Sequence, residues 1–187
     1  MKTRIGIPLL AIFLFTALIS LFPRCREVSE QQPPVGIHTP DSVEGNDSVP
    51  ATILLSSDFK RVVIARLKHN TDILQGIKDA VEKEGIHNAV ILSGIGSTCR
   101  HHIHSVDNCT FPARNVFYEQ EMPMDILCMN GYIIEGRVHA HISLSNGAQA
   151  IGGHLEPGTR VFTFCIITLG ILEDEPSLER VDDLTWR

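Results

Sequence analysis

The 187-residue sequence predicts an α+β (α/β) domain with a largely antiparallel, mixed sheet of about seven strands and one helix packed on a face. Short apolar segments rich in β-branched residues recur from residue 61 to residue 172, whereas one segment alone shows convincing helical spacing. This helix follows the first strand and precedes all the others. Such an order is typical of antiparallel pairing with a helix on one side of the sheet.

The expected strands are bounded by glycine-rich or polar turns. Asn130-Gly131 and Asn146-Gly147 are strong signals for two-residue hairpin turns. Gly94 and Gly96 are expected to end the buried strand that precedes them. Strands are predicted at 61–68, 89–95, 124–129, 132–135, 137–144, 149–155 and 160–172, and the segment 100–106 is a further candidate.

The expected helix spans residues 71–84. Its apolar residues recur at helical spacing, as in Ile73, Leu74 and Ile77. Asn70 or Thr71 can cap its first turn with a side-chain oxygen. Gly85 can end it in the left-handed conformation that glycine adopts at low cost.

The residues before the domain have the composition of a targeting segment and a linker. Residues 1–24 predict a signal peptide or membrane anchor, because Lys2 and Arg4 precede an uncharged apolar run. Cys25 follows, so a lipoprotein is the second interpretation, although Phe22-Pro23-Arg24 lacks small residues. Residues 25–51 are rich in proline and polar residues and predict a disordered linker. We therefore expect an exported or membrane-anchored protein, periplasmic or at the cell surface.

Composition limits the function classes. The hydrophobic fraction is 43% and the charged fraction 20%, values of an ordinary globular domain, which we expect at 52–175 with a charged tail at 176–187. The net charge of −6 does not favour binding to nucleic acid phosphates. None of the five cysteines forms a CxxC pair, which argues against a structural zinc ribbon.

Three histidines in the last third of the chain predict a metal site. His139 and His141 are two residues apart on an expected strand, so they share a face. If Asn146-Gly147 is a two-residue loop, His139 lies opposite His154 and His141 lies opposite Gly152. Three imidazoles on one face then meet a single ion, although a set of hydrogen-bonded surface histidines is the alternative.

Three nitrogen ligands with an open position are the pattern of catalytic zinc. A divalent metal is therefore expected at His139, His141 and His154, zinc first, with iron, nickel or copper as alternatives. His102 and His104 share a face of the candidate strand 100–106. They could approach the same ion, or they could line a surface groove or a subunit contact.

Two glutamates are candidates for an acid or base beside the ion. In the same register Glu156 lies opposite Arg137, as an orienting pair or, more simply, as a cross-strand ion pair. Glu135 lies on the preceding expected strand. No catalytic residue is assigned from the sequence.

Several short motifs in the chain resemble those of the plants and prokaryotes conserved (PPC) domain, a family often labelled DNA-binding. The resemblance covers roughly residues 61–172. It is carried, in order, by Ala65-Arg66-Leu67, Asp72-Ile73-Leu74, Gly85-Ile86, Ser93-Gly94-Ile95-Gly96-Ser97, Leu127-Cys128-Met129-Asn130-Gly131, His139-Ala140-His141-Ile142-Ser143-Leu144 and Gly152-Gly153-His154-Leu155.

This resemblance implies a homotrimer with a fold similar to that of acetolactate decarboxylase and a zinc-dependent ester hydrolase family. In those families an HxH pair and a third histidine hold zinc, which corresponds to His139, His141 and His154. The expected function is a metal-dependent small-molecule site, with lyase or hydrolase chemistry as the possible reaction. A purely structural metal is one alternative. The family's DNA-binding label is the other, but the Arg-Gly-Arg-Pro element of the plant members is missing and Arg100-His101-His102 is the single compact basic segment.

Overall fold

The computed structural model describes residues 48–174 and 177–183. The expected targeting segment at 1–24 lies outside the described residues, as do most of the expected linker and part of the charged tail. Among the described residues, no helix is long and apolar enough to cross a membrane.

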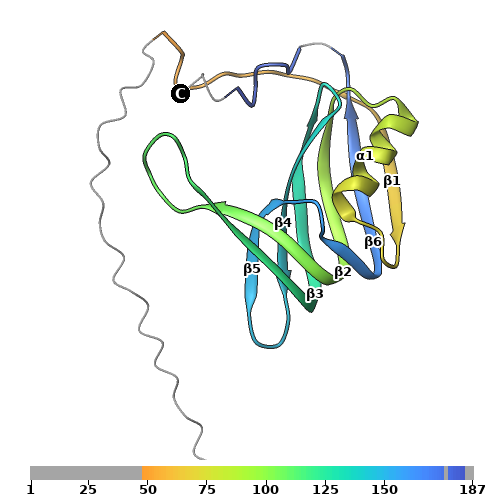
Figure 1. The fold of residues 1–187 in the computed structure, drawn as a ribbon. Helices are drawn as coiled ribbons and strands as arrows, with labels where there is room; N and C mark the ends of the chain where they lie inside the picture. Colours follow the sequence, from red (N-terminus) through yellow and green to blue (C-terminus); the bar gives the residue numbers. More distant parts are fainter. Residues whose placement is uncertain (1–47, 175–176, 184–187) are drawn as a thin grey trace, which may run out of the picture. The chain divides into compact units, whose positions relative to one another are not determined.

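Six antiparallel strands and one helix make up the described fold (Figure 1). The strand order is β1-β6-β2-β3-β4-β5, and β5 also pairs with the far end of β2. Beyond the point where β2 separates from β6, the strands β2, β3, β4 and β5 therefore form a closed sheet. The elements are β1 Phe59–Lys68, α1 Ile73–Glu84, β2 Ala89–Val106, β3 Asn115–Ile134, β4 Arg137–Ser145, β5 Ala150–Leu155 and β6 Arg160–Leu172.

The helix α1 is bounded by side-chain and backbone caps. Its N-cap is Asp72, whose side chain accepts a hydrogen bond from Gln75 N at 2.9 Å. The prediction of Asn70 or Thr71 as the cap is wrong, because Asn70 has a φ of 66° in the preceding turn, outside the extended region that an N-cap adopts. Gly85 ends the helix in the left-handed conformation, as predicted.

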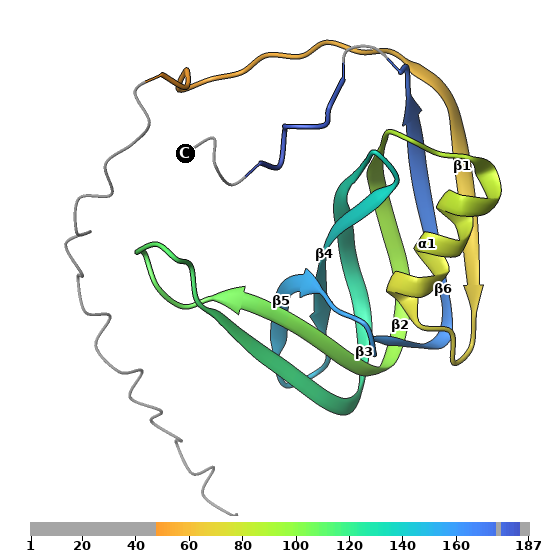
Figure 2. The ribbon, with the colours of Figure 1, turned by 45° about the horizontal axis from the view of Figure 1, so that its top comes forward.

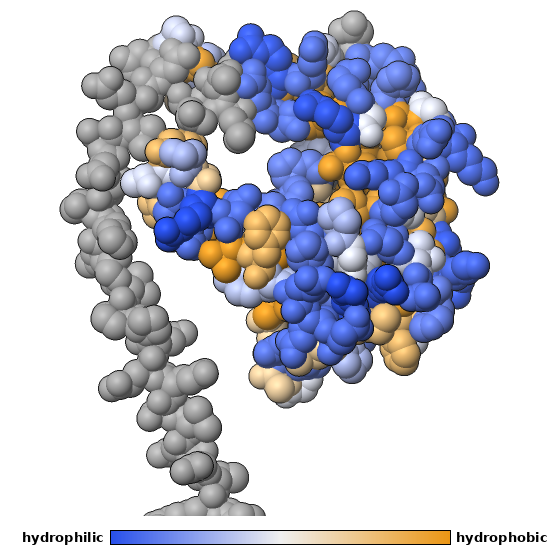
Figure 3. Space-filling view, in the orientation of Figure 1, coloured by the Kyte–Doolittle hydropathy of each residue, from blue (hydrophilic) through white to orange (hydrophobic). Residues whose placement is uncertain are grey.

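The apolar side of α1 belongs to one buried cluster that also includes residues from all six strands. Figures 1 and 2 show α1 beside β6 and β1. Figure 3 shows apolar side chains gathered in this part of the molecule, with hydrophilic side chains around them. Residues exposed by 1% or less in this cluster include Ile73, Ile77, Ile91, Ile103, Met129, Ile133, Leu144, Leu155, Ile167 and Leu169.

The described structure has six strands because some of the predicted strands are parts of one longer strand. The segments 89–95 and 100–106 form one strand, β2, and Gly96 lies within it at a φ of 144°. A Cβ on Gly96 would lie 2.0 Å from Phe164 O, so glycine is needed for the close approach of β6. Register shifts on both sides of Thr98 turn the far half of β2 away from β6 and toward β5.

The predicted hairpin turn at Asn130-Gly131 is also wrong. Both residues lie inside β3, where Gly131 pairs with Ile91 on one side and Ala140 on the other. The turn to β4 is at Glu135-Gly136, where both residues have a positive φ. Residues 115–123, which no sequence signal marked as a strand, extend β3 into an arm with the end of β2 (Figure 2).

Candidate metal centre

The strand β4 presents two histidines on the exposed face of the sheet. His139 and His141 are exposed, and the residues that alternate with them, Ala140 and Ile142, are buried. His139 lies opposite Tyr132 of β3, and His141 lies opposite Asn130. The sequence signal for one shared face is therefore confirmed by the register of β4.

The third histidine reaches this face in a different register from the predicted one. The loop between β4 and β5 has four residues, 146–149, because Asn146 Oδ1 accepts hydrogen bonds from Ala148 N at 2.9 Å and Gln149 N at 3.0 Å. The pairing therefore shifts by two residues, and His154 lies opposite His141 instead of His139. A shift of two keeps the side chain on the same face, whereas a shift of one would reverse it.

The same shift changes two other predicted pairs. Gly152 lies opposite Ser143 instead of His141. Arg137 does not pair with Glu156, because its guanidinium contacts Asp182 at 3.2 Å. Glu156 instead contacts His104.

The three histidines form a compact group of donors, called here the three-histidine cluster (His139, His141 and His154). One ring nitrogen of each lies within 4.8 Å of the others. The ring centroids are 4.9 Å apart for His139 and His154 and 5.5 Å apart for the other two pairs. Two nitrogens on a tetrahedral ion with bonds of 2.0–2.1 Å are about 3.3 Å apart, a separation within the 4.8 Å limit of this group, so the three residues could hold a metal ion.

Burial and mutual repulsion disfavour a proton on two rings of this cluster, His141 and His154. His141 is exposed at the surface, but the part of its ring that is buried lowers its pKa, and the neighbouring rings of His139 and His104 lower it further. Burial also lowers the pKa of His154, with the same two rings acting in the same direction and the Glu156 carboxylate opposing them. A neutral imidazole offers the lone pair that a metal needs, so the lowered pKa values of these two rings leave them available as ligands.

A second group lies beside the first. His104 of β2 is directly opposite His154, with ring centroids 4.6 Å apart. Its Nδ1 lies 2.6 Å from Glu156 Oε1, and both side chains are largely buried. His104, His154 and Glu156 also offer donors within 4.8 Å of one another.

The other histidines of β2 do not join either group. His102 Nδ1 lies 2.7 Å from Pro157 O, and its ring packs near Phe117. His101 points to the interior, where its Nδ1 has no hydrogen-bond partner. Of the predicted pair His102 and His104, the structure therefore brings one to the cluster. Glu135, at the turn before β4, joins neither group.

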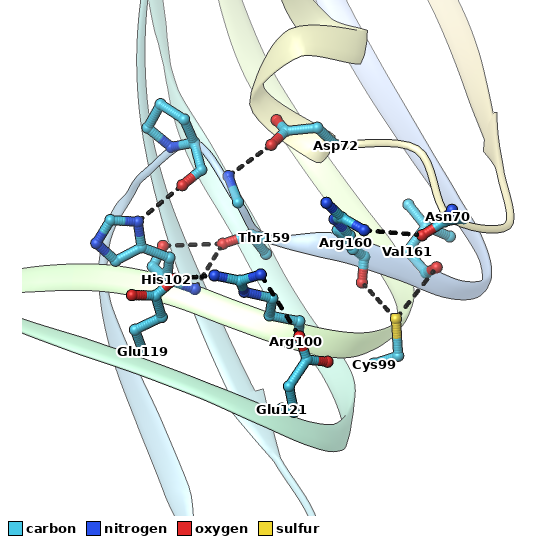
Figure 4. Close-up of polar contacts among 12 residues, drawn as sticks. Asn70, Asp72, Cys99, Arg100, His102, Glu119, Glu121, Thr159, Arg160 and Val161 are labelled. Carbon is cyan, nitrogen blue, oxygen red and sulfur yellow. Dashed lines mark hydrogen bonds and ion pairs between the residues drawn. The ribbon is translucent and has the colours of Figure 1, made fainter.

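Hydrogen bonds to β2 and to the N-cap of α1 hold the segment that follows β5 in place (Figure 4). Thr159 is fully buried, and its hydroxyl accepts from His102 N at 2.9 Å and donates to His102 O at 2.8 Å. Asp72, the N-cap of α1, also accepts from Gly158 N at 2.5 Å through its second oxygen. These contacts fix the chain that carries Glu156 and position it against His104.

Asn130 and Tyr132 are site residues that the sequence analysis missed. Both line the same exposed face, next to His141 and His139. The Asn130-Gly131 turn motif concealed the continuous strand in the sequence, so the exposed face that these residues share was not predicted.

Comparisons with known proteins place this geometry in a family. Residues 55–173 match the Plants and Prokaryotes Conserved (PCC) domain. A plant- and prokaryote-conserved protein from Pyrococcus horikoshii is 26% identical with a TM-score of 0.57, and the match covers 66% of this chain and 87% of that chain. No curated protein matches the sequence at a comparable significance.

Two other solved structures share the fold at lower identity. A metal-containing protein from Archaeoglobus fulgidus is 24% identical with a TM-score of 0.58, over 65% of this chain and 86% of that chain. A candidate DNA-binding protein from Bacteroides thetaiotaomicron is 17% identical with a TM-score of 0.53, over 64% and 85%.

Proposed function

The chain belongs to the Plants and Prokaryotes Conserved domain family, and from this premise we propose that it binds a divalent metal ion, zinc first, through His139, His141 and His154. We further propose that the bound ion serves a small-molecule site whose substrate is a carbonyl compound. The reaction class is metal-assisted lyase or hydrolase chemistry.

The observation that carries this proposal is the composition of the three-histidine cluster. Three nitrogen donors from two adjacent strands converge within 4.8 Å without a carboxylate among them. Such a set leaves a fourth position for water or substrate, which distinguishes catalytic from structural zinc. When bound there, zinc polarises a carbonyl oxygen or lowers the pKa of a water molecule. The fold neighbour from Archaeoglobus fulgidus, named a metal-containing protein, supports the proposal.

The chain's own residues around the cluster are suited to orienting a small polar molecule. Asn130, opposite His141, offers an amide donor and acceptor, and Tyr132, opposite His139, offers a hydroxyl. Glu156 is the acid or base candidate of this site, because its carboxylate lies in the group that shares His154. Glu135 is not retained for that role, since it joins neither group of donors.

The DNA-binding alternative has less support in the charges of this chain. The one compact basic segment is residues 100–102, where Arg100 pairs with Glu119 and with Glu121 and His101 is buried. Its charge is therefore neutralised before it could meet a phosphate. A DNA-binding assay over a range of salt concentrations tests this alternative, and no binding at low salt would end it.

An exposed apolar surface supports the proposed homotrimer. The cross-strand row Val62, Gly170, Val90, Tyr132 and His139 lies on one face, so the cluster lies at the margin of this surface. An apolar surface of this kind is typical of a subunit contact. Its most exposed members are Val62, Ile64 and Ile95, at 55%, 70% and 53%. Sedimentation velocity tests the assembly: a trimer supports it and a monomer contradicts it.

The proposed export is tested by cell fractionation, because residues 1–24 lie outside the described structure. Recovery with the periplasmic or membrane fraction would support it. Recovery with the cytosolic fraction would contradict it.

Metal analysis of the purified protein tests the site. We expect about one equivalent of zinc per chain in the three-histidine cluster and its loss in His139→Ala. His87→Ala, an exposed histidine after α1, is the matched control and should keep its metal. Equal metal content in the wild type and His139→Ala would overturn the proposal.

A further inference from the structure

We propose that His104 and Glu156 form a second divalent cation position, which shares His154 with the three-histidine cluster. This inference rests on the proposed function, because it assumes that the first ion is held on the other side of His154. The centre would then hold two neighbouring ions per chain.

The topology places His154 between two histidine-bearing strands. β5 pairs with β4 on one edge and with the far half of β2 on the other. His154 therefore has His141 directly opposite on one side and His104 directly opposite on the other. This arrangement exists because β2 bends away from β6 after Gly96, so that its second half closes onto β5.

The second position has a different donor set from the first. His104 Nδ1 and Glu156 Oε1 are 2.6 Å apart, and their side chains are 18% and 21% exposed. A largely buried carboxylate and imidazole, with a second imidazole whose ring centroid is 4.6 Å from that of the first, form a mixed nitrogen and oxygen set that suits zinc, cobalt or manganese. The carboxylate also supplies the negative charge that the three-histidine cluster lacks.

Two separate ions fit the geometry better than one ion with four histidines. His104 offers a donor close to His154 and Glu156, but it does not form a single group with His139 and His141. A histidine ring has two nitrogens, so His154 can bind one ion through each once its ring proton is lost. The cation takes the place of the hydrogen bond between His104 and Glu156, and the ring proton that His154 gives up goes to solvent.

Equilibrium dialysis of the full chain against Zn²⁺ tests this inference. We expect two equivalents for the wild type and one for Glu156→Gln, which keeps the shape and removes the carboxylate charge. His104→Gln should lose the same equivalent. Glu135→Gln, an exposed glutamate outside both groups, is the matched control and should keep two. Thermal melting in EDTA checks that each variant folds.

The outcomes separate this inference from the proposed function. One equivalent in the wild type, or two in both the wild type and Glu156→Gln, would overturn the second position. If His104 and Glu156 only support the first ion, the wild type binds one equivalent and Glu156→Gln binds that same equivalent more weakly. This result would also overturn the second position. Loss of an equivalent in Glu156→Gln but not in His139→Ala would instead contradict the three-histidine cluster.

Discussion

The region around α1 and the region around β4 and β5 differ in the kind of side chain that they gather. The first buries apolar side chains such as Ile77 and Ile167 completely or nearly so. The second collects His104, His139, His141 and His154 on one face, where burial and the neighbouring rings disfavour a proton on His141 and His154. The contrast teaches that the first region stabilises the fold, while the second gathers metal-ligand donors that folding alone does not require.

The largest expected effect lies in the apolar region. Ile77→Ala removes a side chain that is 1% exposed and leaves a cavity, so it should lower the free energy of unfolding by about 2–5 kcal/mol. Urea denaturation in EDTA measures the change. Lys78→Ala, the exposed neighbour, should change stability by less than about 0.5 kcal/mol. Equal effects of the two substitutions would show that α1 is not packed against the core.

Asp72 joins the two regions, and its removal should have an intermediate effect. One carboxylate oxygen caps α1 at Gln75 N, and the other accepts from Gly158 N behind Glu156. Asp72→Ala should cost about 0.5–2 kcal/mol through the lost cap, more if the second contact is also lost. Asp72→Asn separates the cap at Gln75 N from the contact with Gly158 N, because its amide keeps one acceptor oxygen. Unfolding free energies unchanged in both variants would contradict this role.

The smallest expected effect concerns His101 and appears as a pH dependence. Burial lowers its pKa below 6.5, so the unfolded chain takes up the proton first as the pH falls. This residue therefore contributes a loss of stability below about pH 6.5, at most about 1.4 kcal/mol per pH unit.

His101→Leu removes that contribution. Its stability relative to the wild type should increase between pH 7.5 and pH 5.0, as measured by urea denaturation in EDTA. A stability difference that stays constant with pH would show that His101 is not buried in its neutral form.

Sequence patterns predicted the local features of both regions. The i, i+2 spacing of His139 and His141 fixed their shared face, and Gly85 and the apolar run at 160–172 marked a helix end and a strand. The non-local features were not predictable in this way. A glycine motif at Asn130-Gly131 looks like a turn, yet the close approach of His139 O explains the glycine. The Asn146 side chain lengthens its loop, and the bend of β2 that brings His104 to His154 depends on bulges without a local signature.

The most direct test of the account is the absorption spectrum of the protein loaded with one equivalent of Co²⁺. Three imidazoles and one water give tetrahedral cobalt, which absorbs visible light far more strongly than the octahedral aqua ion. We expect an intense visible band for the wild type and for His87→Ala, and its loss in His141→Ala. A weak octahedral spectrum in the wild type, or the same intense band in His141→Ala, would contradict a metal centre built on the three-histidine cluster.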